Sequence, residues 1–206
     1  MDILFPPDPF ARAIEDMTLS EISGIIPRAN YIDEKTLAPL CYQSEYTRTF
    51  IWHIKYKGNM KLAQKAAEIL YDELAEFLAE AAECNNFKKP LLIPIPISKA
   101  RWRERGYNQA EEIGKRLARL LGNQVEYMPH TLKKIKDTQS QARTHSRHER
   151  LENLRDCFNT HKPDMLNKRN VLLLDDVITT GATTTEAIKV LRKAGVKKII
   201  RVALAH

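Results

Sequence analysis

The stretch VLLLDDVITTGAT, from Val171 to Thr183, decides the fold of this 206-residue chain. Four apolar residues lead directly into Asp175 and Asp176, and a hydroxyl-rich turn containing Gly181 follows. The short apolar run predicts a buried strand, and the apolar periodicity of residues 182–194 predicts a helix. A strand–turn–helix unit is typical of a parallel α/β sheet, in which ligands bind at the carboxyl ends of the strands. The sequence therefore predicts a binding site at this turn.

The two adjacent carboxylates narrow the chemistry of that site. Carboxylates close to one another repel, so a cation or hydrogen-bond donors must compensate them. Vicinal ribose hydroxyls are such donors, and Mg²⁺ is a hard cation that prefers oxygen ligands. Strand alternation would send Asp175 and Asp176 to opposite sides unless the chain turns there. The alternative is that the acid pair merely ends a strand.

The turn that follows has the features of an anion site. It comprises Thr179, Thr180, Gly181, Ala182 and Thr183. Amides at a helix N-terminus and the helix dipole favour an anion, and a glycine permits close approach of the backbone. The predicted occupant is a 5′-phosphate. An ordinary turn with a helix cap is the alternative, but the complete order of strand, acids, glycine and helix favours the phosphate site.

The rest of the chain fits a parallel sheet flanked by helices. Further helices are expected over residues 10–17, 45–56, 59–84, 108–121 and 149–158, and strands over 37–42, 90–97 and 199–205. Residues 133–147 are polar and basic without a period, which predicts a long loop. Residues 1–36 are expected to form an irregular N-terminal cap or hood, and residues 37–206 the main domain.

Bulk properties restrict the class of protein. No apolar run approaches a membrane span and the N-terminus does not resemble a secretory signal, so a cytoplasmic protein without membrane contact is expected. Cys41, Cys84 and Cys157 form no CxxC pair, which argues against a zinc ribbon or a disulfide framework. The net charge of +7 is compatible with nucleic-acid binding, with a site for a polyanionic small molecule, or with an ordinary solvated surface. Walker A and GxGxxG motifs are absent from the sequence.

Several motifs together resemble the ComF (ComFC or GntX-like) family of phosphoribosyltransferase-like proteins. They are IKYKG at 54–58, LIPIPISKARWRERGYNQ at 92–109 and VLLLDDVITTGATTTEA at 171–187, of which RGYNQ is the most family-specific. The resemblance implies a type I phosphoribosyltransferase fold and phosphoribosyl pyrophosphate (PRPP) as the donor, bound with Mg²⁺ mainly through the ligand. Family members usually begin with a cysteine-rich zinc module, but no cysteine precedes Cys41 here, so no zinc is expected.

The resemblance also implies roles for residues. Asp175 and Asp176 would be catalytic and, with residues 179–183, would bind the ribose and its 5′-phosphate. The pyrophosphate would lie against the tight loop at residues 96–101, with contacts drawn from Ser98, Lys99, Arg101 and Arg105. The loop at 133–147 would be a lid that brings Arg143 or Arg147 to the pyrophosphate. A basic helix entry on the surface and a basic loop without a ligand are the alternatives for these two segments.

Two functions remain open at this point. One is transfer of the phosphoribosyl group to an unknown acceptor, in the context of competence and DNA uptake with which the family is associated. The other is a PRPP- or nucleotide-binding adaptor without catalysis, or a protein that handles single-stranded DNA for natural transformation. Single-stranded DNA or a competence helicase would then be partners, and Trp52, Trp102 and Tyr107 could support stacking and backbone contacts.

Overall fold

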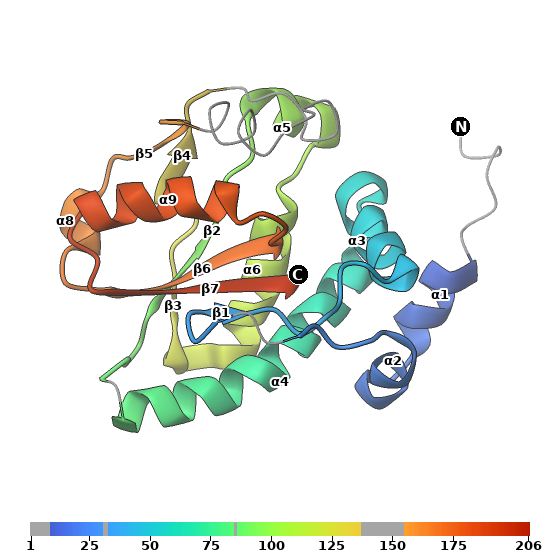
Figure 1. Ribbon diagram of the computed structural model, residues 1–206. Coiled ribbons are helices and arrows are strands. Elements are labelled where there is room, and N and C mark those ends of the chain that lie inside the picture. Colours follow the sequence, from blue (N-terminus) through green and yellow to red (C-terminus); the bar gives the residue numbers. More distant parts are fainter. Residues whose placement is uncertain (1–8, 31–32, 85, 137–154) are drawn as a thin grey trace.

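A five-stranded sheet, in the order β1-β7-β6-β2-β3, forms the centre of the computed structural model, which describes residues 9–30, 33–84, 86–136 and 155–206 (Figure 1). The five strands are β1 (Thr36–Leu37), β2 (Leu91–Pro94), β3 (Glu126–Tyr127), β6 (Asn170–Val177) and β7 (Lys198–Ala205). Every pairing in this sheet is parallel. The predicted parallel α/β fold is therefore confirmed.

The chain changes direction across the sheet between β2 and β6. From β2 it passes to β3 on one side, and it later returns to β6 on the other side of β2. Such a switch point is where parallel sheets bind ligands, at the carboxyl ends of the two central strands. The fold thus places the loops after β2 and β6 side by side.

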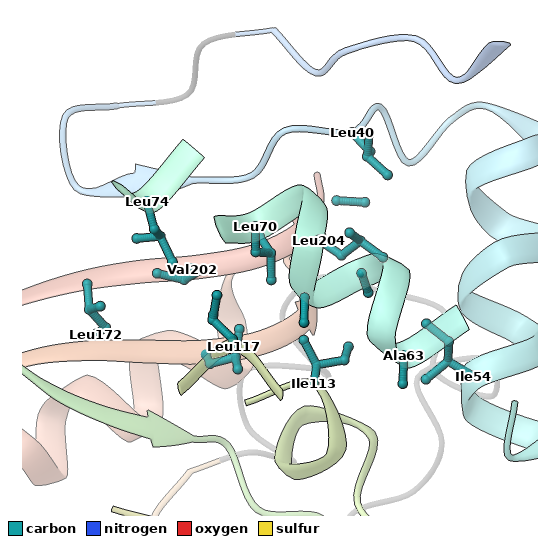
Figure 2. Packing of buried hydrophobic residues seen from close by; sticks show 14 of the residues in the cluster. Leu40, Ile54, Ala63, Leu70, Leu74, Ile113, Leu117, Leu172, Val202 and Leu204 are labelled. Atoms are coloured by element: carbon teal, nitrogen blue, oxygen red, sulfur yellow. The ribbon is translucent and has the colours of Figure 1, made fainter. Parts of the chain in front are cut away.

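Helices cover both faces of the sheet. On one face lie α4 (Met60–Cys84) and α6 (Gln109–Leu121), and their apolar side chains pack on the sheet. Figure 2 shows Leu70 and Leu74 of α4 and Leu117 of α6 close to Val202 of β7. On the other face lies α9 (Ala182–Lys193), which connects β6 to β7 with the right-handed crossover expected for parallel strands.

The N-terminal segment is more helical than expected. Besides α1 (Pro9–Asp16), it contains α2 (Leu19–Ile25), which opens with a capping box between Thr18 and Glu21. That signature was readable in the sequence as a Thr followed three residues later by a Glu. With α3 (Glu45–Lys57), these helices pack on α4, and their buried side chains belong to the same hydrophobic cluster as the sheet. The domain boundary at residue 36 stays a prediction.

Two short strands lie where a loop and a helix were expected. β4 (Leu132–Lys134) begins the predicted loop, and β5 (Phe158–Thr160) ends the predicted helix; the two strands pair antiparallel. Both predictions are wrong at these positions because Leu132 and Phe158 are buried in the α9-side cluster, a long-range contact that local periodicity does not reveal. Residues 137–154 lie outside the described residues.

The remaining elements are short. The predicted strand at 37–42 is reduced to β1 and two isolated bridges of Leu40, one with Arg28 and one with Ala205, because Pro39 interrupts the run and has no N–H to donate. The short helices α5 (Lys99–Arg105) and α8 (Pro163–Leu166) and a 3₁₀ turn at Gly122–Gln124 complete the described elements. None of the described helices combines the length and apolarity needed to cross a membrane.

Candidate active site

The loops after β2 and β6 leave the sheet next to one another. Pro94 is opposite Leu174 in the strand register, and the amide of Ile95 donates to the carbonyl of Leu174 at 2.8 Å. The strand ends at Pro94, within the predicted strand at 90–97, because Pro94 and Pro96 have no N–H to donate to a strand ladder. On its other side β2 pairs with β3 only at Leu91 and Leu92. Pro94 therefore lies beyond the end of that pairing, where its missing N–H costs no hydrogen bond between the strands.

The acid pair lies on a strand that does not turn. β6 continues through Val177, so alternation sends Asp175 and Asp176 to opposite faces of the sheet. Asp176 shares its face with Leu174 and the α4–α6 cluster, and it is only 5% exposed. Asp175 is partly exposed and shares its face with Leu173 and α9. The two acids therefore have different environments.

Lys55 of α3 compensates the buried acid. Its Nζ lies 2.7 Å from Oδ2 of Asp176, and the side chains are 21% and 7% exposed. The amide of Val177 donates to Oδ1 of Asp176 at 2.9 Å, and the amide of Asp176 donates to Oδ1 of Asp175 at 2.9 Å. In Figure 1 the carboxyl ends of β6 and β7 point toward α3. From the sequence, Lys55 and Tyr56 of the family motif at 54–58 could either line the pocket or simply pack, and the structure places Lys55 against the acid pair.

These contacts separate the pKa values of the two acids. Burial and the neighbouring charge of Asp176 raise the pKa of Asp175 to about 8, and Lys55 opposes that rise. Burial also acts to raise the pKa of Asp176, but the charge and hydrogen bond of Lys55 outweigh it and lower the pKa. Desolvation acts to lower the pKa of Lys55, but the charges of Asp176 and Asp175 outweigh it and raise the pKa. At neutral pH the cluster therefore contains an ammonium, an ionised Asp176 and a largely protonated Asp175.

The predicted phosphate loop forms the N-terminus of α9. Gly181 is the N-cap and has a left-handed φ of 70°, a conformation that favours glycine. The Thr180 hydroxyl accepts from the Ala182 amide at 3.4 Å, and the Thr184 hydroxyl donates to the Gly181 carbonyl at 2.9 Å. Thr179 is exposed and Thr183 half-buried. The amides of the first helical turn have no partner within the helix, so the loop can receive an anion.

An arginine that the sequence analysis did not select lies beside this loop. A Cβ at Gly181 would be 3.6 Å from Nη1 of Arg201 on β7. The Arg201 guanidinium also pairs with the Asp33 carboxylate at 2.5 Å. Only the parallel pairing of β6 with β7 brings Arg201 to this position, so no local signal in the sequence could have identified it.

The four residues predicted to contact pyrophosphate lie at α5. The expected tight loop at 96–101 is shorter than predicted, because helix begins at Lys99 with Ser98 as its N-cap. The Ser98 hydroxyl accepts from the Arg101 amide at 3.4 Å. Lys99 is exposed and Arg101 half-buried. The structure thus places these side chains beside the loop after β2, and their contact with pyrophosphate stays a prediction.

Arg105 makes several contacts within the protein. Its guanidinium carbon lies 4.7 Å from the centre of the Tyr56 ring, and Nη1 donates to the side-chain oxygen of Gln109 at 3.1 Å. Its Nε is buried and has no hydrogen-bond partner among the described residues. Arg105 therefore connects α5 with α3 and α6, whatever its role toward a ligand.

The RGYNQ motif braces the elements around the site. The Tyr107 hydroxyl donates to the Ile54 carbonyl at 2.6 Å and so holds the last turns of α3. Asn108 caps α6 by accepting from the Ala110 amide at 3.0 Å, and its side-chain nitrogen donates to the Ile95 carbonyl at 3.0 Å. From the sequence, Asn108 and Gln109 could cap and brace the helix rather than touch a ligand, and for Asn108 the structure shows both contacts.

Two further features are the predicted lid and a separate cavity. Arg143 and Arg147 of the predicted lid lie outside the described residues; the segment that contains them connects β4 with β5. A separate cavity of about 650 Å³ lies at the opposite, amino end of β7, lined by residues such as Phe77, Phe87, Arg192 and Ile200. It is remote from the acid pair.

Within the described ranges, no cluster of three His, Cys, Asp or Glu side chains is close enough to hold a metal ion. Asp176 is already paired with Lys55. The expectation that Mg²⁺ is held mainly through the ligand stays a prediction.

Comparison with known proteins agrees with this geometry. The phosphoribosyl transferase domain family matches residues 107–206. Competence protein F of Haemophilus influenzae is 34% identical over 151 residues, which cover 72% of this chain and 63% of that protein. The ComFC competence protein of Bacillus subtilis is 25% identical over 185 residues, which cover 77% of this chain and 72% of that protein. The ComFC protein of Streptococcus pneumoniae is 31% identical and is covered to 60% of its length.

Solved structures resemble the chain more distantly. A hypoxanthine phosphoribosyltransferase from Staphylococcus aureus has 14% identity and a TM-score of 0.40, covering 68% of this chain and 62% of that one. The glutamine PRPP amidotransferase of B. subtilis, complexed with ADP and GMP, has 16% identity and a TM-score of 0.39, covering 68% of this chain and 26% of that one. The chain is thus similar to the ComF competence proteins over most of its length, and its parallel sheet and domain match are those of a phosphoribosyltransferase-like fold.

Proposed function

We propose that the protein binds PRPP at the carboxyl edge of β2 and β6 and transfers its phosphoribosyl group to an acceptor. The observation that carries the proposal is the position of the loop after β6, with its acid pair and its helix N-terminus, directly beside the loop after β2. This arrangement provides for the ribose, for its 5′-phosphate and for the pyrophosphate at three neighbouring places on one sheet edge.

Each part of the site would bind one part of the donor. The N-terminus of α9, with Thr179, Thr180 and Gly181, would receive the 5′-phosphate. Asp175 and Asp176 would orient the ribose hydroxyls. Ser98 and the basic residues of α5 would face the pyrophosphate. Mg²⁺ bound to the pyrophosphate would neutralise part of the charge of the leaving group.

In the reaction, the bond between C1′ and the pyrophosphate oxygen breaks, and the pyrophosphate leaves with the bonding electron pair. Positive charge develops on the ribose ring, and the ionised acid of the pair, Asp176, would stabilise it electrostatically. A nucleophile on the acceptor then forms the new bond to C1′. Since the activated sugar would react with water, exclusion of solvent is needed; the predicted lid with Arg143 and Arg147 would supply it.

Calorimetric titration of PRPP with Mg²⁺ tests this function. The wild type is expected to bind, and the double variant Asp175→Asn with Asp176→Asn is expected to lose measurable binding while it stays folded. Asp164→Asn, on α8 away from the site, is the matched control and is expected to bind like the wild type. Failure of the folded wild type to bind PRPP would refute the pocket assignment.

An observation also favours the second candidate, an adaptor that handles single-stranded nucleic acid. Trp52, Tyr56 and Trp102 are 45%, 51% and 57% exposed on α3 and α5. Lys57 lies over the Trp52 ring at 5.4 Å, and Arg105 lies over the Tyr56 ring. Exposed rings interleaved with cations are typical of surfaces on which bases stack and phosphates bind.

This second function makes a different prediction. An oligonucleotide is expected to bind with an affinity that falls steeply with salt, because phosphate contacts release counterions. Trp52→Ala with Trp102→Ala would weaken binding by about tenfold or more, at 1–3 kcal/mol for each stacked base. The Asp175→Asn, Asp176→Asn variant would retain it. PRPP binding without turnover against a panel of nucleobases, together with salt-sensitive DNA binding, would favour the adaptor over the enzyme.

A further inference from the structure

We propose that Lys55 is a positioning residue of the PRPP site, and that α3, upstream of the matched phosphoribosyl transferase domain, therefore completes this site. The inference rests on the proposed function. It assigns to the family motif at 54–58 a task that is separate from packing: Lys55 holds Asp176 in place as an ionised acceptor and leaves Asp175 as the more exposed acid of the pair.

The first argument is the geometry of the ion pair. Nζ of Lys55 is 2.7 Å from Oδ2 of Asp176, and both side chains are largely buried. Burying an ammonium or a carboxylate alone carries a large desolvation cost, so each requires the other. With Val177 donating to Oδ1, both carboxylate oxygens of Asp176 have a neighbour that fixes their direction.

The second argument is that Lys55 itself is held from both sides. Its neighbour Ile54 is buried and accepts a hydrogen bond from Tyr107. Its other neighbour, Tyr56, lies under the Arg105 guanidinium. A Cβ at Gly58 would lie 3.5 Å from the Tyr107 ring, so the end of α3 packs closely on the RGYNQ segment. The lysine is therefore placed by the fold and is not a surface side chain that happens to reach an acid.

The third argument concerns charge. The groups that act on Lys55 are Asp176, Asp175 and Tyr42. The cluster thus contains one ammonium for two carboxyl groups, and Lys55 decides which of them is ionised, since it lowers the pKa of Asp176 while burial and Asp176 raise that of Asp175. Without the ammonium, the pKa of Asp176 would rise, and its ability to accept hydrogen bonds from ribose hydroxyls would decrease.

The test measures PRPP affinity, with Mg²⁺, from pH 6 to pH 9 by calorimetry. Lys55→Met removes the charge with little change of volume, Lys55→Arg retains it, and Lys61→Met is the control. Lys61 also pairs with a carboxylate, Glu15 at 3.1 Å, but it is 74% exposed and lies on α4 away from the acid pair.

Lys55→Met is expected to weaken PRPP binding at pH 7 by about ten- to a hundredfold, the effect of losing an interaction with a charged group. The midpoint of its affinity against pH is expected to move upward by about one unit or more, because a nearby opposite charge lowers a carboxyl pKa by that amount. Lys55→Arg should lie closer to the wild type in both respects, and Lys61→Met should match the wild type.

The outcomes distinguish this inference from the proposed function. A wild type that does not bind PRPP overturns both. A wild type that binds, with Lys55→Met binding equally well, overturns the role of Lys55 alone. Weaker binding with an unchanged pH midpoint also overturns it, because a purely structural effect of α3 would give that result. If Lys55→Met does not fold, Lys55→Gln, which removes the charge but can still donate a hydrogen bond to Asp176, replaces it in the same pH series. An unchanged affinity and an unchanged pH midpoint for that folded variant would contradict the inference.

Discussion

At the residue scale, the two acids of the motif are adjacent in sequence but differ in chemistry. Because β6 stays extended, Asp175 and Asp176 lie on opposite faces, and only Asp176 meets Lys55. The same strand therefore presents one acid with a raised pKa and one with a lowered pKa. Such a separation is typical of sites in which one group must accept hydrogen bonds while its neighbour exchanges a proton.

The raised pKa of Asp175 predicts the pH dependence of stability. The folded state binds more protons than the unfolded state between 3.8, the ordinary pKa, and about 8. The free energy of unfolding therefore falls with rising pH in this window, by at most about 1.4 kcal/mol per pH unit. Asp175→Asn removes this contribution, so its stability relative to the wild type should rise from pH 4 to pH 8, as measured by urea unfolding.

Asp176→Asn provides the contrast. Since the pKa of Asp176 is lowered, its contribution is present above the unfolded pKa of about 3.9 and is lost as the pH falls below it. This variant should be less stable than the wild type at pH 7, and the difference should diminish in acid. The same pH trend for both variants would contradict the assignment of the two pKa directions.

Gly181 allows a second prediction at this scale. Its φ of 70° is strained for other residues, although a Cβ there would meet its nearest atom only at 3.6 Å. Gly181→Ala should therefore lower the free energy of unfolding by about 1 kcal/mol through backbone strain alone. Gly24→Ala is the control, because Gly24 lies within α2 with open space around its Cα; it should stabilise by up to about 1 kcal/mol. Equal effects of the two changes would refute the conformational argument.

At the scale of elements, the site depends on how α6 and α3 are held against β2 and β6. Asn108 connects the start of α6 with the end of β2, and Tyr107 connects the same segment with α3. The family-specific RGYNQ motif thus acts through the backbone of neighbouring elements. Tyr107 and Asn108 therefore contribute to the site by holding the elements that form it.

Asn108→Ala tests that role. It removes the N-cap of α6 and leaves the buried carbonyl of Ile95 without this donor, so it should lower the free energy of unfolding by about 2–3 kcal/mol. Ser44→Ala is the matched control, since Ser44 is the N-cap of α3 but makes no capping hydrogen bond with its side chain. Its effect should be below about 0.5 kcal/mol. Chemical denaturation measures both, and similar losses would contradict the bracing role.

At the scale of the whole molecule, one hydrophobic cluster joins the N-terminal helices to the sheet. Ile14 of α1 and Ile22 of α2 are buried in it, as are Ile54 of α3 and Leu70 of α4, which Figure 2 labels. The position of Lys55 relative to Asp176 therefore depends on the packing of this cluster and not only on α3 itself. A loss of packing in this cluster should therefore lower the free energy of unfolding and also displace Lys55 from Asp176.

Leu70→Ala tests the contribution of this core. Leu70 is fully buried between α4 and the sheet, so the cavity should lower the free energy of unfolding by about 2–5 kcal/mol. Leu120→Ala on α6 is the control, because Leu120 is 38% exposed, and its effect should stay below about 1 kcal/mol. Comparable losses in urea unfolding would mean that the core is not centred on α4.

Local signals predicted the elements that form the centre of the fold. The apolar runs of β2 and β6 and the periodicity of α4, α6 and α9 gave elements whose ends agree with the structure within a few residues. The general rule for parallel sheets predicted a site at the turn after β6, and the strand order, which was not predicted, brings the loop after β2 beside it. The strands β4 and β5 were not predicted, because their pairing joins segments that are distant in the sequence. Helix α2 was not predicted either, although its capping box is readable in the sequence.

The sequence by itself determined the parallel α/β class, the strand with its acid pair and the glycine turn into α9, because these depend on apolar periodicity and on the conformations that individual residues allow. Tertiary structure alone decided that Asp176 pairs with Lys55, that Arg201 lies beside Gly181 and that RGYNQ holds α3 in place. The physical reason is that burial and charge compensation arise only when segments far apart in the chain pack together, and no local pattern records which segments will meet.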